Sequence, residues 1–165
     1  MSNKDALRLP VVSLGDEHLA IGYLMRRNIL AYKAPPNNQG YDLICIHPDP
    51  SKSEKVISVQ VKSRYQTDCD RSFPVKESTF GAFDYLMVVF LNIGYFFTKS
   101  GKEGGVQEPK IYTVPKSIIE ANHYNPISGF QKARLNKVDL APYQNEKGLE
   151  QIAVALSIPY PSREA

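Results

Sequence analysis

The chain has 165 residues, of which 42% are hydrophobic and 22% are charged, and its formal net charge at pH 7 is +3. This length suits one domain that buries roughly two thirds of the surface of its unfolded chain, and the mild charge does not by itself indicate a nucleic-acid partner. The longest apolar run, 86–97, is interrupted by Asn92 and Gly94, and the N-terminus has no apolar signal core, so neither a membrane span nor secretion is expected. The cysteines Cys45 and Cys69 form neither a CxxC pair nor a disulfide pattern, which favours a reducing cytoplasm.

The first predicted element is a helix from Ser13 to about Asn28, because Ser13 followed three residues later by Asp16 resembles a capping box. On a helical wheel, the apolar side of this helix consists of Leu14, Ala20, Ile21, Leu24 and Met25. The polar side carries Asp16, Arg26 and Arg27. Glu17 falls within the apolar stripe, where a carboxylate needs a cation or a lysine as its partner. Alternatively, Glu17 favours the helix dipole and stays at the rim of the core.

A β-hairpin is predicted from Gly40 to Arg64, because two runs rich in Val and Ile flank a polar loop at 48–54. We expect a register that places Asp42 opposite Gln60. Opposite residues of an antiparallel pair share a face, and side chains alternate along each strand. Asp42, Gln60 and Lys62 should therefore converge at the open end of the hairpin.

A carboxylate, an amide oxygen and an ammonium placed together suit the binding of a hard divalent cation beside a reactive water. Each residue also has a more ordinary explanation, with Asp42 as a turn residue at the hairpin entrance and Lys62 as a lysine extending from a strand end. His18, His47 and His123 lack metal-ligand spacing among themselves or with the cysteines, which argues against zinc. Neither a P-loop nor a G-x-S-x-G elbow is present.

The rest of the chain alternates short strands and helices. The further elements that we expect are strands at 29–33, 73–75, 84–91, 95–98, 111–114 and 135–140, and helices at 77–82, 115–121 and 144–156. The run 84–91 is typical of a fully buried central strand, and 95–98 is expected to pair back on it through a turn at 92–94. Segments 63–72 and 100–109 are expected to be loops, the second of them flexible. The apolar stripe of the last helix should consist of Leu149, Ile152, Ala153 and Leu156.

This order of elements indicates an α/β fold in which helices flank a central mixed β-sheet. Basic residues outnumber acidic ones by five to one between 110 and 137, where the charged residues are Lys110, Lys116, Glu120, Lys132, Arg134 and Lys137. They can supply phosphate contacts, with a solvated basic face as the alternative.

The sequence resembles the PD-(D/E)XK nucleases and their restriction-endonuclease-like fold. In both, an acidic residue on a helix, here Glu17, is followed by a hairpin that carries the remaining motif residues, here Asp42, Gln60 and Lys62. The local signatures are Gly40-Tyr41-Asp42 and Gln60-Val61-Lys62-Ser63-Arg64. The resemblance covers about residues 13–98, whereas 110–157 is similar only in its strand-then-helix character. It implies a single nuclease-like domain over 1–165.

The resemblance implies that Mg²⁺, or alternatively Mn²⁺, is bound by Asp42, by the side-chain carbonyl of Gln60, by the backbone carbonyl of Val61 and by Glu17 directly or through water. Lys62 would orient or activate the attacking water and stabilise charge on the phosphate. Gln60 stands where the commonest motif has Glu, and the loss of one negative charge should weaken cation binding. Similar glutamine variants occur in Mrr-like restriction enzymes and in some intron-homing nucleases.

The expected function is therefore that of a metal-dependent DNA endonuclease, with Glu17, Asp42, Gln60 and Lys62 as catalytic residues. DNA contacts are expected from Arg64, Lys132, Arg134 and Lys137. The first alternative is a nucleic-acid-binding protein that keeps the nuclease fold without cutting, and the second is a structural or interaction protein in which these residues coincide by chance. A homodimer is expected from resemblance, because enzymes of this fold often pair to cut two strands.

Overall fold

A computed structural model describes residues 9–66, 70–98 and 101–161; the terminal residues and Cys69 lie outside the described residues. The strands are β1 (Leu30–Lys33), β2 (Leu43–Ile46), β3 (Val56–Arg64), β4 (Ser72–Pro74), β5 (Tyr85–Phe90), β6 (Ile93–Thr98), β7 (Gly101–Val106), β8 (Lys110–Pro115), β9 (His123–Tyr124) and β10 (Lys132–Arg134). The helices are α1 (Leu9–Arg26), α2 (Lys116–Ala121) and α3 (Glu146–Ala155), with 3₁₀ turns η1 (Pro50–Lys52), η2 (Glu77–Thr79) and η3 (Ala141–Tyr143). None of the described helices is long and apolar enough to cross a membrane.

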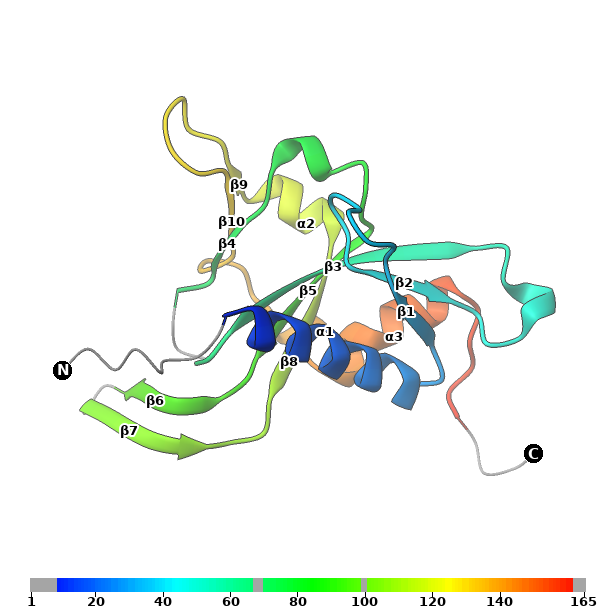
Figure 1. Cartoon of the computed structure of the whole chain (residues 1–165), viewed down its shortest axis with the longest axis horizontal. Coiled ribbons are helices and arrows are strands. Elements are labelled where there is room, and N and C mark those ends of the chain that lie inside the picture. Colours follow the sequence, from blue (N-terminus) through cyan, green and yellow to red (C-terminus); the bar gives the residue numbers. More distant parts are fainter. Residues whose placement is uncertain (1–8, 67–69, 99–100, 162–165) are drawn as a thin grey trace.

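The main sheet has five strands in the order β1-β2-β3-β5-β8. It is mixed, because β3 and β5 are parallel whereas the other neighbours are antiparallel. Helices α1 and α3 pack on one face, and α2 lies on the other face with a small sheet of order β4-β10-β9 (Figure 1). The predicted α/β architecture, a mixed sheet flanked by helices, is confirmed.

The two faces of the main sheet are covered to different extents. Strand β5 is buried on both, with Met87 in the core under α1 and α3 and Leu86 in the core under the small sheet. Strand β3 packs only its first face, through residues such as Val59, and presents Gln60 and Lys62 on the second. This explains why the sequence of β3 alternates apolar and polar residues whereas that of β5 is apolar throughout.

The predicted hairpin has the expected register. Ile44 lies opposite Ser58 and Ile46 opposite Val56, and the connection between the strands contains the short turn η1. The predicted stripe of α3 is also confirmed, because all four of its members are buried, Leu149, Ile152, Ala153 and Leu156.

The predicted wheel for α1 is right for Ala20 and Leu24, which are buried, and for Arg26, which is exposed, but it is wrong for four other residues. Asp16 and Arg27 are 1% and 2% exposed, although both were expected on the polar side, whereas Leu14 and Met25 are 46% and 45% exposed. The helix also begins at Leu9 and not at Ser13. Arg27 is buried because Glu150, distant in the sequence, meets its guanidinium there, which helical periodicity does not register.

Three predictions in the second half are wrong: the pairing of one strand, one loop and one further strand. Residues 95–98 belong to β6, which pairs with β7 and not with β5, because β3 and β8 already occupy both edges of β5. Strand β7 also replaces most of the loop expected at 100–109. No strand spans 135–140, which begins with a turn. The strand in this part of the chain is β10, which ends just before residue 135 and pairs with β4 and β9.

Replacing Gly148 of α3 by Ala is expected to destabilise the protein by about 1–3 kcal/mol. A Cβ at this position would collide with the backbone carbonyl oxygen of Tyr143 and lie 3.0 Å from the Cβ of Thr113. Urea denaturation measures the change in the free energy of unfolding.

Gly22→Ala in α1 is the matched control. A Cβ added at Gly22 would meet nothing within 4 Å, so the higher helix propensity of Ala should stabilise the protein by about 0.5–1 kcal/mol. If Gly148→Ala proved stabilising as well, Gly148 of α3 would not lie as close to the carbonyl of Tyr143 in η3 as the structure shows.

Candidate active site

The site begins where the β2–β3 hairpin opens. The last paired residues of the two strands are Leu43 and Val59, and continuation of their register places Asp42 opposite Gln60. The backbone N–H of Asp42 donates to the carbonyl of Val59 at 2.8 Å, and its Oδ2 accepts a hydrogen bond from the N–H of Val61 at 2.7 Å. The carboxylate of Asp42 is therefore held against β3 between the positions of Gln60 and Lys62.

A glycine shapes the approach of the chain to Asp42. Gly40 has a φ of +97°, and a Cβ there would lie 2.7 Å from the Cβ of Ala82. Both the left-handed backbone and the close approach require glycine at this position. The expected Gly-Tyr-Asp signature thus has a structural reason of its own.

Asp42 and Lys62 influence each other's ionisation. Burial raises the pKa of Asp42; the nearby Glu17 adds to this, whereas the Val61 N–H and Lys62 oppose it. Burial lowers the pKa of Lys62, and Asp42 opposes that shift. Both shifts favour neutral forms, so the buried charges are only partly compensated by each other. A cation beside the carboxylate would lower the pKa of Asp42 and relieve this cost.

Gln60 supplies an oxygen that lacks a partner. Its side chain is 9% exposed, and its Oε1 accepts no hydrogen bond from the residues that the structure describes. A buried acceptor without a donor costs about 1–3 kcal/mol. Because amide and carboxylate oxygens are ligands for hard divalent cations, Gln60 and Asp42 fit the metal that the sequence suggests.

Glu17 reaches the same region from α1 but already has a partner. Its Oε2 lies 2.8 Å from the Nζ of Lys33, at the end of β1. A lysine partner was one of the two that the sequence suggested for Glu17, but Lys33 itself was not singled out. The available signal was its position at the end of the predicted strand 29–33. Among the described residues, no group of three or more Asp, Glu, His or Cys residues could hold a metal.

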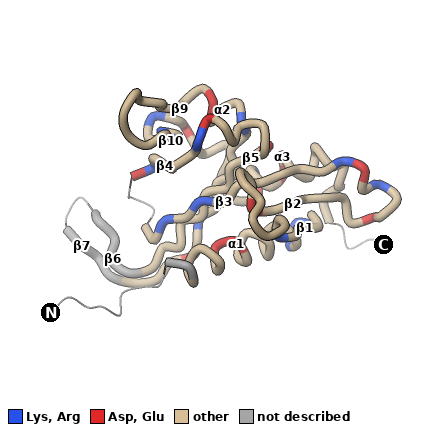
Figure 2. Tube along the Cα trace, turned by 45° about the horizontal axis from the view of Figure 1, so that its top comes forward, with Lys and Arg blue, Asp and Glu red and all other residues tan. Residues whose placement is uncertain are grey.

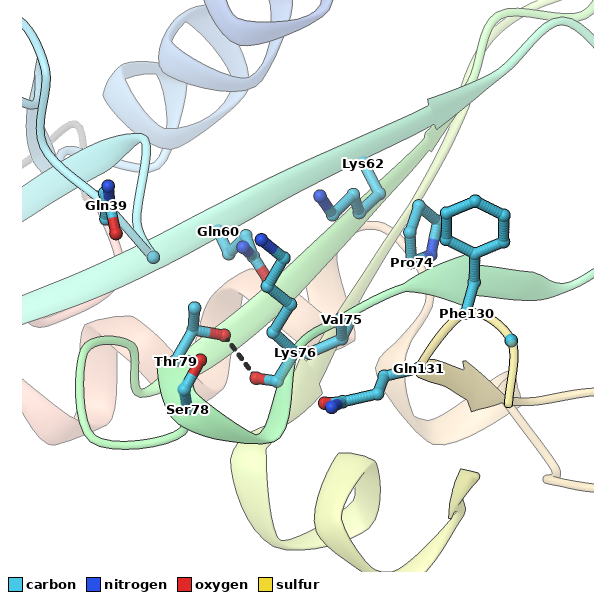
Figure 3. Close-up of a pocket in the computed structure, with 12 residues that line it drawn as sticks. Gln39, Gln60, Lys62, Pro74, Val75, Lys76, Ser78, Thr79, Phe130 and Gln131 are labelled. Atoms are coloured by element: carbon cyan, nitrogen blue, oxygen red, sulfur yellow. Dashed lines mark hydrogen bonds between the residues drawn. The ribbon is translucent and has the colours of Figure 1, made fainter. Parts of the chain in front are cut away.

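A cleft of about 530 Å³ lies beside Gln60 and Lys62, between β3 and the small sheet (Figure 3). It forms because the small sheet covers β5 and β8 but leaves the second face of β3 open. Its lining consists of Gln39, Gly40, Gln60, Lys62, Pro74, Val75, Lys76, Ser78, Thr79, Gly129, Phe130 and Gln131. The charged members, Lys62 and Lys76, are both cationic, and Figure 2 shows basic segments on β3 and near β10.

The four residues expected to contact DNA lie outside the lining of this cleft. Arg64 donates hydrogen bonds to the carbonyls of Ser63 and Ser72, at 3.0 and 2.7 Å, so its guanidinium links β3 to β4. Lys132 is half-buried, whereas Arg134 and Lys137 are exposed. Their DNA contacts remain predictions.

Lys76 and Phe130 were not foreseen as site residues. Lys76 lies just before η2, and Phe130 lies in the loop between β9 and β10. No local pattern marks either residue, because only the packing of the small sheet beside β3 brings both to the cleft.

This fold is the restriction-endonuclease-like fold. One solved structure similar to the chain is that of a bacterial homing endonuclease, I-Ssp6803I, with a TM-score of 0.52 and 14% identity, covering 91% of this chain and 96% of that chain. Another is Hjc, a Holliday junction resolvase from Archaeoglobus fulgidus, with a TM-score of 0.49 and 9% identity, covering 90% and 98% respectively. No protein-family model and no curated protein sequence matches the chain.

Proposed function

We propose that this protein is a metal-dependent DNA endonuclease that hydrolyses phosphodiester bonds. The observation that carries the proposal is the meeting of the Asp42 carboxylate, the unpartnered Gln60 oxygen and Lys62 at the edge of a cationic cleft. The fold is also one that a homing endonuclease uses.

In this proposal Asp42, the side-chain oxygen of Gln60 and the backbone carbonyl of Val61 hold Mg²⁺ or Mn²⁺. When bound, the ion supplies electrophilic stabilisation of the charge that develops on the phosphate. Glu17 contributes from α1, and its pairing with Lys33 favours an indirect role through water. The small number of acidic ligands leads us to expect modest cation affinity.

Lys62 acts on the water and the phosphate. Burial lowers the pKa of Lys62, so the neutral amine, which can accept a proton, forms more readily than at an exposed lysine. As the ammonium it donates to a phosphate oxygen, and as the amine it accepts a proton from the attacking water. The negative charge of Asp42 opposes this lowering of the pKa and so favours the ammonium form of Lys62.

The DNA backbone occupies the cleft, where Lys62 and Lys76 face it. Arg134, Lys132 and Lys137 extend the basic surface on and after β10, and Arg64 holds β3 and β4 together at its edge. A homodimer would bring two such sites to a duplex, one for each strand.

A second candidate is a DNA-binding protein that has kept the fold without cutting. Two observations favour it: the amide of Gln60 in place of a carboxylate, and the neutralisation of Glu17 by Lys33. Both reduce the negative charge available to a divalent cation.

The test is the nicking of supercoiled plasmid by the wild-type protein with Mg²⁺, with Mn²⁺ and with EDTA. We expect cutting with either metal and none with EDTA. Gln60→Glu, which adds a negative charge, should lower the metal concentration for half-maximal cutting by roughly tenfold. Salt-sensitive DNA binding without cutting under any of these conditions would favour the second candidate.

A further inference from the structure

The loop between β9 and β10 carries the two most exposed large apolar side chains of the described residues. Ile127 is 111% exposed and Phe130 is 89% exposed. The loop projects beyond the body of the molecule in Figure 1, and Phe130 also lines the cleft near Pro74 in Figure 3. The aromatic ring of Phe130 therefore stands at the mouth of the candidate active site, and the exposed side chain of Ile127 lies three residues before it in the same loop.

The base of this loop is fixed to the segment that precedes and begins η2. The ring Nε2 of His123 lies 2.7 Å from the carbonyl oxygen of Val75. The side-chain amide of Asn125 donates to Glu77 at 2.8 Å, and the backbone N–H of Glu77 donates to the side-chain oxygen of Gln131 at 2.6 Å. Anchors on both sides of the apolar tip hold it at a set position beside the cleft, so little order has to be gained when a ligand arrives.

The chemistry of the surroundings identifies the partner. The charged residues of the cleft lining are Lys62 and Lys76, so the cleft favours a polyanion. Two apolar side chains are too small a patch for a protein interface, whereas one or two suffice as a wedge between base pairs. Aromatic side chains also stack on unpaired bases with little regard to sequence.

We propose that Ile127 and Phe130 form a wedge that enters the base stack of DNA bound in the cleft, with Phe130 stacking on a displaced or unpaired base. This inference rests on the proposed function, because it assumes that the cleft receives DNA. It adds a substrate preference: duplexes with an unpaired base or an easily opened step bind more tightly than fully paired ones. Less stacking energy is lost when the wedge enters such a step.

The experiment compares two labelled duplexes of about 20 base pairs, one fully paired and one with a single unpaired adenine, by fluorescence anisotropy in EDTA. The wild-type protein is expected to bind the second duplex about tenfold more tightly. In the double variant Ile127→Ser, Phe130→Ser this preference should fall below about twofold, while the salt dependence of binding to the paired duplex stays the same because no charge is removed.

Val154→Ser is the matched control, because Val154 is an exposed apolar residue (66%) on α3, which packs on the other face of the sheet. It should keep the full preference. A wild-type protein without preference, or a double variant that retains it or loses affinity for both duplexes equally, would overturn the wedge and leave the nuclease proposal standing. Failure of the wild type to bind either duplex would overturn both.

Discussion

Replacing Lys62 by Met is expected to lower the rate of plasmid cleavage by about 10³-fold or more. Methionine keeps much of the apolar bulk of the lysine side chain, which is half-buried, but removes the group that faces the water and the phosphate. The proposed metal ligands Asp42, Gln60 and Val61 are unchanged, so Mn²⁺ binding measured by calorimetry should be retained. The expected result is a protein that binds metal and DNA but does not cut.

Asp42→Asn should weaken metal binding, which Lys62→Met should leave intact. It removes a negative charge at a position that the Val61 N–H already holds, so the hairpin should keep its geometry. We expect Mn²⁺ affinity to fall at least about tenfold together with the cleavage rate. The control is Lys52→Met, at an exposed lysine of η1 at the far end of the hairpin, which should leave the Mn²⁺ affinity and the cleavage rate unchanged.

Full cleavage activity in Lys62→Met would refute the role that we assign to Lys62.

Arg27→Ala is expected to destabilise the protein by about 2–4 kcal/mol. Arg27 is 2% exposed, and its Nε and Nη2 donate to Glu150 of α3 at 3.0 and 2.7 Å. Its Nη1 donates to the carbonyl of Pro159 at 3.0 Å, and the guanidinium lies 4.4 Å from the ring centre of Tyr160. One side chain thus connects α1, α3 and the segment that follows α3.

The neighbouring Arg26 offers the matched control for thermal or urea unfolding. Its side chain is 72% exposed, and it lies 4.0 Å from Glu146, a distance and exposure at which an ion pair contributes little. Arg26→Ala should change the free energy of unfolding by less than about 0.5 kcal/mol. Equal effects of the two substitutions would contradict the buried position of Arg27.

The contrast between these two arginines marks the limit of pattern reading in α1. Helical periodicity placed both on the polar side, because periodicity weighs only the hydrophobicity of each residue. Glu150, the partner that makes the burial of Arg27 favourable, is 123 positions away in the sequence. Asp16 illustrates the same limit: it is buried, burial raises the pKa of its carboxyl, and nothing local predicts it.

The hairpin was predictable for the complementary reason. Alternation along β2 and β3 and the length of their connection are local properties, and they determine the register that brings Asp42 near Gln60 and Lys62. The same local logic identified β5 and the buried stripe of α3. It failed for β6, because which strand finds a free edge depends on the whole sheet.

The amino-acid sequence was thus sufficient to specify the strands of the candidate site and the residue types that suit a metal and a phosphate. Only the folded chain determined that Lys33 neutralises Glu17, and that Lys76 and Phe130 face a common cleft with Lys62. Contacts within a hairpin follow from side-chain alternation over a few residues. Contacts between layers depend on how separate elements pack, and one residue's neighbours in sequence carry little information about that.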